Sequence, residues 1–290
     1  MKANRHSSTA EATAAVRAWH TIHHEPRILE DPYAIELTSG MWRLICRSRL
    51  LSWLVFGLAL KRLLPIAAEI ICRSRYTEDK LESAIRDGVQ QYVLLGAGFD
   101  SYALRRPPIG EAVRLFELDH PLSQRTKKER LGKHYDRLSN SVEFVPVDFE
   151  EQTLAEVLQS CGYDPEQRAF FAWLGVVQYL APGAVRSSLQ DLAACTASGS
   201  ELVFDYLLPA SELTPADRPI LEGLQRFTQR RGEPLASYFT PSELATMADE
   251  CGFDVVENFS PSDQAAAYFQ EGNHDLMPFS GYHIIHLRRR

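Results

Sequence analysis

The sequence of 290 residues has no apolar run of the length that crosses a bilayer, which takes about 20 residues. Its most apolar window, residues 50–60, ends directly before Lys61 and Arg62. We interpret this window as a buried or capping helix, and contact with lipid or with a partner protein is the alternative that stays open. The sequence therefore predicts no membrane-spanning segment, and we expect no membrane partner.

Paired cysteines are missing as well. The five cysteines, at positions 46, 72, 161, 195 and 251, are odd in number, lie far apart and form no CxxC motif. This spacing is typical of reduced thiols rather than of a disulfide framework. Because no apolar core followed by a small-residue cleavage site occurs near the N-terminus, we expect a cytoplasmic protein.

An excess of positive charge is also missing. The formal net charge is -7 and the isoelectric point is about 5.8. The only dense basic run, Arg288 to Arg290, lies at the end of the sequence. These features argue against a broad nucleic-acid surface, so we expect no nucleic-acid partner.

The sequence shows no complete set of metal ligands. His20, His23 and His24 have the spacing of one helix face, but Pro26 follows closely and no carboxylate completes a standard zinc set. We therefore predict no metal, and we expect a surface or lid position for the three histidines.

From residue 91 onward, short apolar runs alternate with amphipathic stretches, which predicts a parallel sheet wrapped by helices. The predicted strands are 91–97, 113–119, 142–148, 169–175 and 201–208, and the predicted helices between them are 121–136, 150–160 and 184–197. After a helix over 241–251, strands at 253–259 and 282–287 follow with no helix of good periodicity between them. Such strands pair antiparallel. We expect an α/β fold with a Rossmann-like, doubly wound, mostly parallel seven-stranded sheet and an antiparallel final strand.

The first 90 residues have a different character. They predict a helix over 8–22, a short helix with a proline just inside it over 30–37, and helices over 41–87 with a break at Pro65. We expect residues 1–90 to form a helical cap and lid on the sheet domain, residues 91–290. The insertion 209–239 would complete the lid over the carboxyl ends of the strands, where open α/β sheets bind ligands.

A glycine turn follows the first strand of this domain, in the sequence QYVLLGAGFDS. Gly96 and Gly98 would allow a ligand to approach the backbone closely and would permit positive φ. The dinucleotide pattern GxGxxG expects a third small residue where this chain has Ser101. The glycine pair alone is weak evidence, and a plain turn at the end of a strand also explains it.

The next two strands also end in polar groups. Asp119 lies 21 residues after Gly98, near the usual position of an acid that binds ribose hydroxyls. Glu117 is the competing choice on the same strand. The third strand ends at Asp148 and Phe149, an acid and a ring suited to an adenine amino group and an adenine face. Three strand ends that deliver such groups to one edge indicate an adenosine-containing cofactor.

Sequence motifs that are absent narrow the choice of cofactor further. The Gly-Lys-Ser/Thr of a P-loop is absent, which disfavours nucleoside triphosphates. Hydride transfer from a nicotinamide would call for a fuller glycine signature. Methyl transfer from S-adenosylmethionine needs less from the protein, because the sulfonium is already activated and proximity supplies most of the catalysis.

Seven stretches carry a resemblance that is more specific than the glycine pair. They are SSTAEATAAVRA (7–18), LEDPYA (29–34), RSRYTEDKL (73–81), QYVLLGAGFDSYALR (91–105), FELDHP (116–121), VPVDF (145–149) and FFAWLGVVQYL (170–180). In these stretches the chain resembles the leucine carboxyl methyltransferase family, in particular its bacterial small-molecule branch. The resemblance implies S-adenosylmethionine as cofactor, O-methylation of a small-molecule carboxylate or phenol, and a role in secondary metabolism.

The resemblance also implies roles for single residues. Arg75 matches the arginine that pairs with the carboxylate of the cofactor's methionine part, for which its fork is suited. Gly96 and Gly98 match the cofactor loop, Asp119 matches the ribose acid, and Asp148 with Phe149 matches the adenine contact. At Leu174 the chain departs from the phosphatase-methylating members, which carry a glutamate there. This difference favours a different acceptor.

Four further residues are candidates for the acceptor pocket: Arg17, Tyr76, Tyr179 and Tyr206. Core packing explains the tyrosines equally well, and a solvated helix face explains Arg17. The sequence identifies no general base, no single acceptor and no oligomeric state. A nicotinamide-dependent oxidoreductase and a non-catalytic binding module on the same fold are the two alternatives to a methyltransferase.

Overall fold

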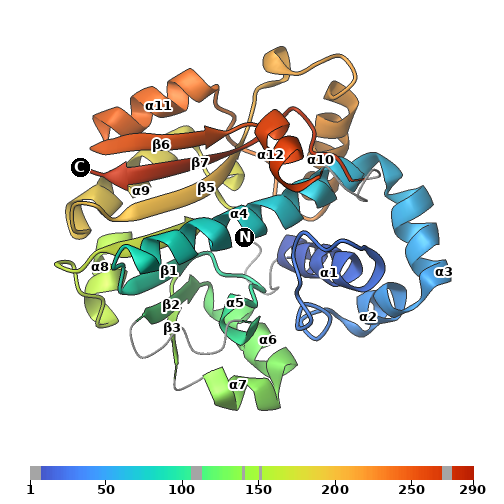
Figure 1. Cartoon of the computed structure of the whole chain (residues 1–290), viewed down its shortest axis with the longest axis horizontal. Coiled ribbons are helices and arrows are strands. Elements are labelled where there is room, and N and C mark those ends of the chain that lie inside the picture. The colour runs from blue at the N-terminus through green and yellow to red at the C-terminus, as the bar shows by residue number, and fades with distance from the viewer. Residues whose placement is uncertain (1–7, 106–112, 139–140, 150–151, 270–275) are drawn as a thin grey trace.

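The computed structural model describes residues 8–105, 113–138, 141–149, 152–269 and 276–290, and these residues form a seven-stranded sheet with helices on both faces (Figure 1). The strands are β1 (Gln91–Leu95), β2 (Arg114–Asp119), β3 (Val142–Pro146), β4 (Ala169–Trp173), β5 (Glu201–Leu207), β6 (Phe253–Phe259) and β7 (Tyr282–Arg289). Their order is β3-β2-β1-β4-β5-β7-β6. All pairs from β3 to β5 are parallel, whereas β7 is antiparallel to both β5 and β6. The predicted fold is confirmed, including its reversed final strand.

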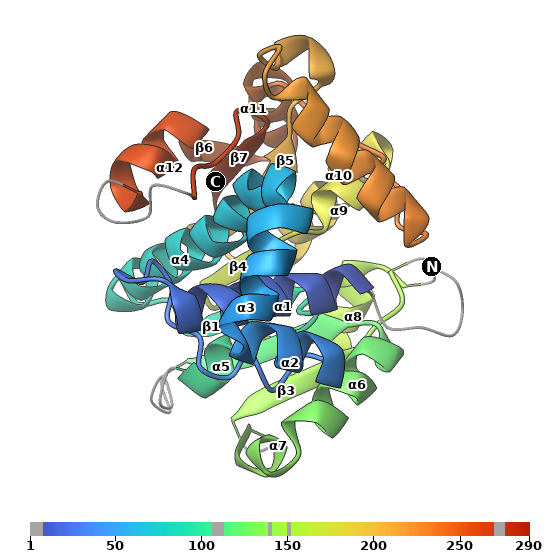
Figure 2. The same ribbon diagram turned by 90° about the vertical axis from the view of Figure 1, so that its right-hand side faces the viewer.

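The described helices cover this sheet and extend from it as a cap. The α-helices are α1 (Ser8–His23), α2 (Gly40–Arg47), α3 (Arg49–Ser52), α4 (Leu64–Arg86), α5 (Tyr102–Arg105), α6 (Pro121–Leu131), α7 (Lys133–Leu138), α8 (Leu154–Ser160), α9 (Pro182–Cys195), α10 (Arg218–Arg230), α11 (Pro241–Glu250) and α12 (Pro261–Tyr268). A π-helix, η1 (Trp53–Ala59), and short 3-10 helices, η2 (Lys61–Leu63), η3 (Val177–Tyr179) and η4 (Ala210–Glu212), complete the set. In Figure 2, α1, α2 and α3 face the viewer in front of the sheet.

Alternation along β1 divides the protein interior into two cores. Tyr92 and Leu94 point to the core that contains residues of α1, α4 and α5. Val93 and Leu95 point to the other core, with residues of α8, α9 and α11. Because side chains alternate between the faces of a strand, a fully buried strand such as β1 must be covered on both sides. This explains why its pattern is continuous rather than alternating.

Three details of the expected secondary structure are wrong. Residues 30–37 form turns rather than a helix. Pro65 lies in the first turn of α4, where its missing N–H costs nothing, so the change of helix occurs before it, at Leu60 to Leu63. The capped helix α12 lies between β6 and β7. It was missed because its eight residues are too few for a clear period.

The window at residues 50–60 is buried on one side only. Phe56 is buried and stacks on Trp19 with ring centroids 4.4 Å apart. Leu50 and Trp53 are exposed by 65% and 56%. The segment does cap the molecule, but the expectation that it is buried is wrong for its outer face.

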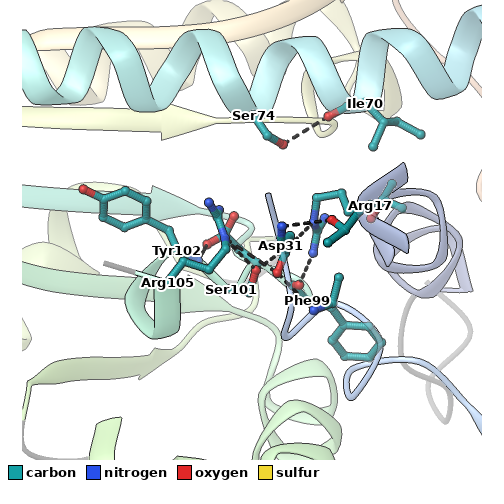
Figure 3. Close-up of polar contacts among 12 residues, drawn as sticks. Arg17, Asp31, Ile70, Ser74, Phe99, Ser101, Tyr102 and Arg105 are labelled. Atoms are coloured by element: carbon teal, nitrogen blue, oxygen red, sulfur yellow. Dashed lines mark hydrogen bonds and ion pairs between the residues drawn. The ribbon is translucent and has the colours of Figure 1, made fainter. Parts of the chain in front are cut away.

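A buried carboxylate joins the cap to the sheet. Asp31, in the turn after α1, accepts hydrogen bonds from Arg17 Nε at 2.8 Å and from Ser101 Oγ at 2.6 Å (Figure 3). Arg105 on α5 lies with its Nε 3.6 Å from the other carboxylate oxygen. Arg17 also donates to the Phe99 carbonyl at 2.5 Å. Helix α1, the turn after it and the loop after β1 are thus fixed to one another.

Arg105 extends the network to α4. Its Nη1 donates to Glu78 at 2.8 Å, and both side chains are buried. Helix α4 also contacts β4 and β5. Helix α4 lies within the predicted cap, residues 1–90, but it packs on the sheet. The division of the chain at residue 90 therefore stays a prediction.

The network lowers the pKa of Asp31. Burial alone would raise this pKa, but the Arg17 and Arg105 guanidinium groups and the Ser101 hydroxyl outweigh it. The stability gained from the ionised carboxylate is fully present above the unfolded pKa, about 3.9, and is lost as the pH falls through the lower folded pKa.

We predict that Asp31→Asn lowers the free energy of unfolding by about 3 kcal/mol, because it leaves two buried arginines short of charge. Urea denaturation at neutral pH measures this loss, and the difference from the native chain should shrink below about pH 4. Asp249→Asn is the matched control: Asp249 is 72% exposed and pairs with Arg290 at the surface. Its loss should stay below about 1 kcal/mol. Equal losses in the two variants would contradict the prediction.

Candidate functional site

The carboxyl ends of the parallel strands border a cavity of about 500 Å³. One side of its wall comes from the turn after β1, the ends of β2 and β3, and the segment after β4. The other side comes from α1, the first half of α4, α10 and the residues that follow α10. A single cavity thus spans the strand ends and the predicted lid.

The glycine turn after β1 forms the floor of this cavity. Gly96 and Gly98 have φ values of +69° and +52°, and both line the cavity. A Cβ on Gly96 would lie 2.7 Å from Val176 Cγ2. The amide of Gly96 donates to the Leu118 carbonyl at 2.9 Å. The turn is therefore held against the end of β2 and has no room for a side chain.

Asp119 lies next to this turn. Its carboxylate lines the cavity and accepts hydrogen bonds from the backbone amides of Gly98 and, at 2.6 Å, His120. Burial raises the pKa of Asp119, although the two amides oppose the shift. The competing residue, Glu117, does not line the cavity. It is buried and accepts from Lys127 Nζ at 2.5 Å.

Asp148 and Phe149 line the same cavity at the end of β3. The Asp148 carboxylate lies 3.8 Å from His120 Nε2, and Phe149 is 44% exposed. An acid and an accessible ring beside Asp119 suit a purine next to a ribose. The structure brings together the glycine pair and the three residues that the sequence selected at the strand ends.

Two arginines of α4, Arg73 and Arg75, have different surroundings, because only Arg73 lines the cavity. Arg75 does not line the cavity. Its side chain is 44% exposed and pairs with Asp79 at 3.0 Å. Arg73 lines the cavity and donates to Asp205 at 2.8 Å. Asp205 in turn accepts from the Gly175 amide at 2.6 Å, so the guanidinium is held at the end of β4.

Sequence reasoning missed Arg73 although it stands two positions from Arg75. Residues two apart on a helix point in nearly opposite directions, since each residue turns the helix by about 100°. The pattern RSR indicates that one arginine faces the sheet, but only the packing of α4 decides which one.

The predicted acceptor residues are divided in the same way. Arg17 and Tyr179 line the cavity, whereas Tyr76 and Tyr206 do not. Tyr76 donates to Glu257 at 2.7 Å and stacks on Phe259. Tyr206 is fully buried and hydrogen-bonds to Asn258. For these two tyrosines, core packing is the better explanation.

An acid that the sequence did not suggest closes the cavity on the lid side. Glu233, just after α10, lines the cavity and accepts from the Thr9 hydroxyl of α1 at 2.5 Å. Tyr179 lies beside it, and burial together with the charge of Glu233 raises the pKa of Tyr179 to about 12. The phenol therefore stays protonated at neutral pH and is available as a donor. No sequence signal marks Glu233, because it stands in an irregular segment.

The three clustered histidines lie outside the cavity lining. His20 accepts from the Ile28 amide at 3.0 Å, and His23 Nε2 lies 2.7 Å from the Cys46 carbonyl. Burial, His24 and Arg27 lower the pKa of His20 to about 3, so its ring is neutral. These contacts hold the turns of the cap together.

The chain is similar to a named family and to curated proteins. Residues 10–193 match the family described as leucine carboxyl methyltransferase. The chain is 27% identical over 301 aligned residues to a protein of Bacillus subtilis, with 99% of each chain covered. It is 31% identical over 269 residues to a protein of Frankia alni, with 90% of this chain and 86% of that chain covered. Both relatives are provisionally named as S-adenosyl-L-methionine-dependent methyltransferases.

Solved structures share the fold. A protein from Thermobifida fusca, provisionally named as a methyltransferase, superposes with a TM-score of 0.64 at 15% identity and covers 98% of this chain and 96% of its own. A DUF574 family protein from Streptomyces avermitilis superposes with a TM-score of 0.58 at 14% identity, with 95% and 97% covered. At these identities the likeness shows the fold alone.

We predict that Gly96→Ala lowers the free energy of unfolding by about 2 to 4 kcal/mol, because positive φ and the Val176 side chain both oppose a Cβ. Gly183→Ala is the control, since nothing lies within 4 Å of a Cβ at this exposed position in α9. It should stabilise the chain by about 0.5 kcal/mol. Denaturant titration compares the two variants, and a Gly96→Ala protein as stable as the native chain would mean that the turn has room for a side chain.

Proposed function

The chain belongs to the leucine carboxyl methyltransferase family of S-adenosyl-L-methionine-dependent methyltransferases, and we propose that it methylates an oxygen atom of a small molecule. The observation that carries this proposal is the single cavity, which has adenosine-type groups at the strand ends and a separate lid wall opposite them. At about 500 Å³ the cavity has the size of a small-molecule site rather than of a protein-binding groove.

The residues present fit the cofactor. Gly96 and Gly98 line the cavity with backbone alone, and Asp119 retains lone pairs for ribose hydroxyls after its two backbone hydrogen bonds. We propose that Asp148 and Phe149 contact the adenine. We also propose that Arg73, rather than Arg75, binds the carboxylate of the methionine part, because Arg73 faces the cavity and Asp205 fixes its guanidinium.

S-adenosyl-L-methionine would supply a methyl group already activated on a sulfonium, so the chain has to hold and align the acceptor. The lid wall offers Glu233 and Thr9 for this purpose, and Tyr179 lies beside Glu233. Of the two acceptors considered, a carboxylate would be repelled by Glu233. With a phenol as acceptor, Glu233 would accept the hydroxyl proton as a general base. We therefore propose a phenol as the acceptor, with Tyr179 as a hydrogen-bond donor to it.

The apolar residue at Leu174 agrees with this choice. Leu174 lines the cavity, and the resemblance implies a glutamate at this position in the phosphatase-methylating members. The site thus differs from those members at the end of β4, as expected of a small-molecule acceptor that is not a protein carboxyl terminus.

We predict that Arg73→Lys weakens binding of S-adenosyl-L-methionine about tenfold, because a lysine cannot reproduce a two-pronged grip on a carboxylate. Arg75→Lys, the matched control on the same helix, should change affinity less than about twofold, since Arg75 points to solvent. Calorimetric titration measures both variants.

The same titration with 5′-methylthioadenosine tests whether the loss of affinity comes from the contact between Arg73 and the cofactor carboxylate. This ligand lacks the amino-acid part, so Arg73→Lys should bind it as the native chain does. If the variant lost affinity for both ligands equally, Arg73 would have a structural role and no contact with the carboxylate.

The reaction itself is tested by titration followed by an acceptor screen. We predict that the chain binds S-adenosyl-L-methionine and S-adenosylhomocysteine but not NAD, and that it methylates phenols in preference to carboxylic acids. Glu233→Gln should lower kcat about 100-fold with cofactor affinity unchanged, which is the range for loss of a general base. Mass spectrometry of the products measures the transfer. NAD binding alone would favour the oxidoreductase, and binding without turnover of any acceptor would favour the non-catalytic module.

A further inference from the structure

Residues 40–64 form a surface that is both apolar and basic, which we call the 40–64 face. Among the described residues, six of the eleven exposed large apolar side chains belong to it: Met41, Leu44, Leu50, Trp53, Leu54 and Leu58. They are between 40% and 67% exposed. In Figure 1 the helices α2 and α3 lie at the outer edge of the molecule, away from the sheet, and in Figure 2 they face the viewer.

The charge of this face is opposite to that of the chain. Residues 40–64 contain five basic residues, Arg43, Arg47, Arg49, Lys61 and Arg62, and no acidic residue. Since the whole chain has a formal charge of -7 and this segment carries +5, the remainder carries -12. The basic residues are therefore concentrated on the same segment as the exposed apolar side chains.

Four of these five cations have no acidic partner among the described residues. Arg43 donates to the carbonyl groups of Ile35, Glu36 and Thr38 and closes a turn of the cap. The other four are exposed. Within the part of the chain that the structure describes, none of these four makes an ion pair with an acidic side chain. They are free to interact with an anionic surface.

The inner side of the segment is firmly packed. Phe56 stacks on Trp19 of α1, and the Ser52 hydroxyl donates to the Ile45 carbonyl at 2.8 Å. His23 of α1 contacts both the Cys46 carbonyl and the Ser52 hydroxyl. The outer side chains are thus presented on an ordered support rather than on a loose segment.

We propose that the 40–64 face binds the surface of a membrane that contains anionic lipids. Exposed large apolar side chains that gather on one segment mark a contact surface. Leucine and tryptophan side chains partition into the boundary of headgroups and acyl chains, while arginine and lysine reach the phosphates around them. No described helix has the length and apolar character needed to cross a bilayer, so the segment would lie in the interface.

Charge favours a membrane over a second copy of this chain. Two copies meeting through this face would bring two clusters of unpaired cations together, which like-charge repulsion opposes. An anionic bilayer attracts each cation and repels the acidic remainder. The bilayer would therefore bind the chain in one orientation, with the 40–64 face inward.

Contact with lipid is the alternative that stays open for residues 50–60, and it replaces the expectation of no membrane partner. The face also adjoins the site: Leu63 lies 3.4 Å from the position of a Cβ on Gly223 of α10, and α10 lines the cavity. Binding through this face would hold one wall of the cavity next to the bilayer.

The test is flotation of the full chain with vesicles of phosphatidylcholine alone and with vesicles of phosphatidylcholine mixed with phosphatidylglycerol. We expect binding to the mixed vesicles, weaker binding to the neutral ones, and a loss of binding as salt is added. Arg49→Gln combined with Arg62→Gln should lower the affinity for mixed vesicles roughly thirtyfold, at about fivefold for each cation. The matched control combines Arg125→Gln with Lys133→Gln, two exposed positions of α6 and α7, and should stay within about twofold.

A second pair of variants tests the apolar part. Leu50→Ser should lower the affinity about tenfold, whereas Met277→Ser, at an exposed position outside the face, should not change it. Binding that is equal for the two vesicle types, or equal for Leu50→Ser and the native chain, would overturn the proposal. So would a folded chain that binds neither vesicle, or sedimentation that shows a dimer lost in Leu50→Ser. Vesicle binding does not depend on turnover, so a failure to find an acceptor leaves this test intact.

Discussion

The buried carboxylate of Asp31 is the constraint on which the site depends. It is shared by Arg17 of α1, by Ser101 and by Arg105 of α5, and these residues lie on both sides of the boundary between cap and sheet. If the cap moved away, the Asp31 carboxylate would lose Ser101 and Arg105, and Arg17 would lose the Phe99 carbonyl. Breaking such a buried network costs several kcal/mol. The cap is therefore a fixed wall of the cavity. Ser101, which breaks the dinucleotide pattern, is part of that attachment.

The residues on the two sides of the cavity are held in place by different kinds of contact. At the strand ends, backbone amides and carbonyls fix the glycine turn and Asp119, and Asp205 fixes Arg73. A ligand bound there meets groups whose positions are set by the sheet. The lid side depends on side chains of an irregular segment, such as Glu233, which accepts a hydrogen bond from Thr9. This division suits an enzyme family in which the cofactor is constant and the acceptor varies.

The distribution of charge adds a second division. The two arginines that line the cavity, Arg17 and Arg73, are each paired with a buried aspartate, whereas residues 40–64 concentrate cations on an acidic chain. An anionic bilayer would attract the basic, apolar face and repel the rest of the acidic surface, so the chain would bind in one orientation. The face and the cavity share α10 as a neighbour, so orientation at a bilayer and access to the cavity are linked through one helix.

The sequence by itself determined the sheet, its reversed last strand, the glycine turn and the acids at the strand ends, because strand periodicity and the residues that follow each strand are local properties of the chain. It did not determine which of Arg73 and Arg75 faces the cavity, that Tyr76 and Tyr206 belong to the core, or that Glu233 meets Thr9 across the lid. Those facts depend on the rotation of α4 against the sheet and on contacts between segments distant in the chain. Only the tertiary structure decides them, because the free energy of burying one helix face is summed over the whole interface and is not encoded at any single position.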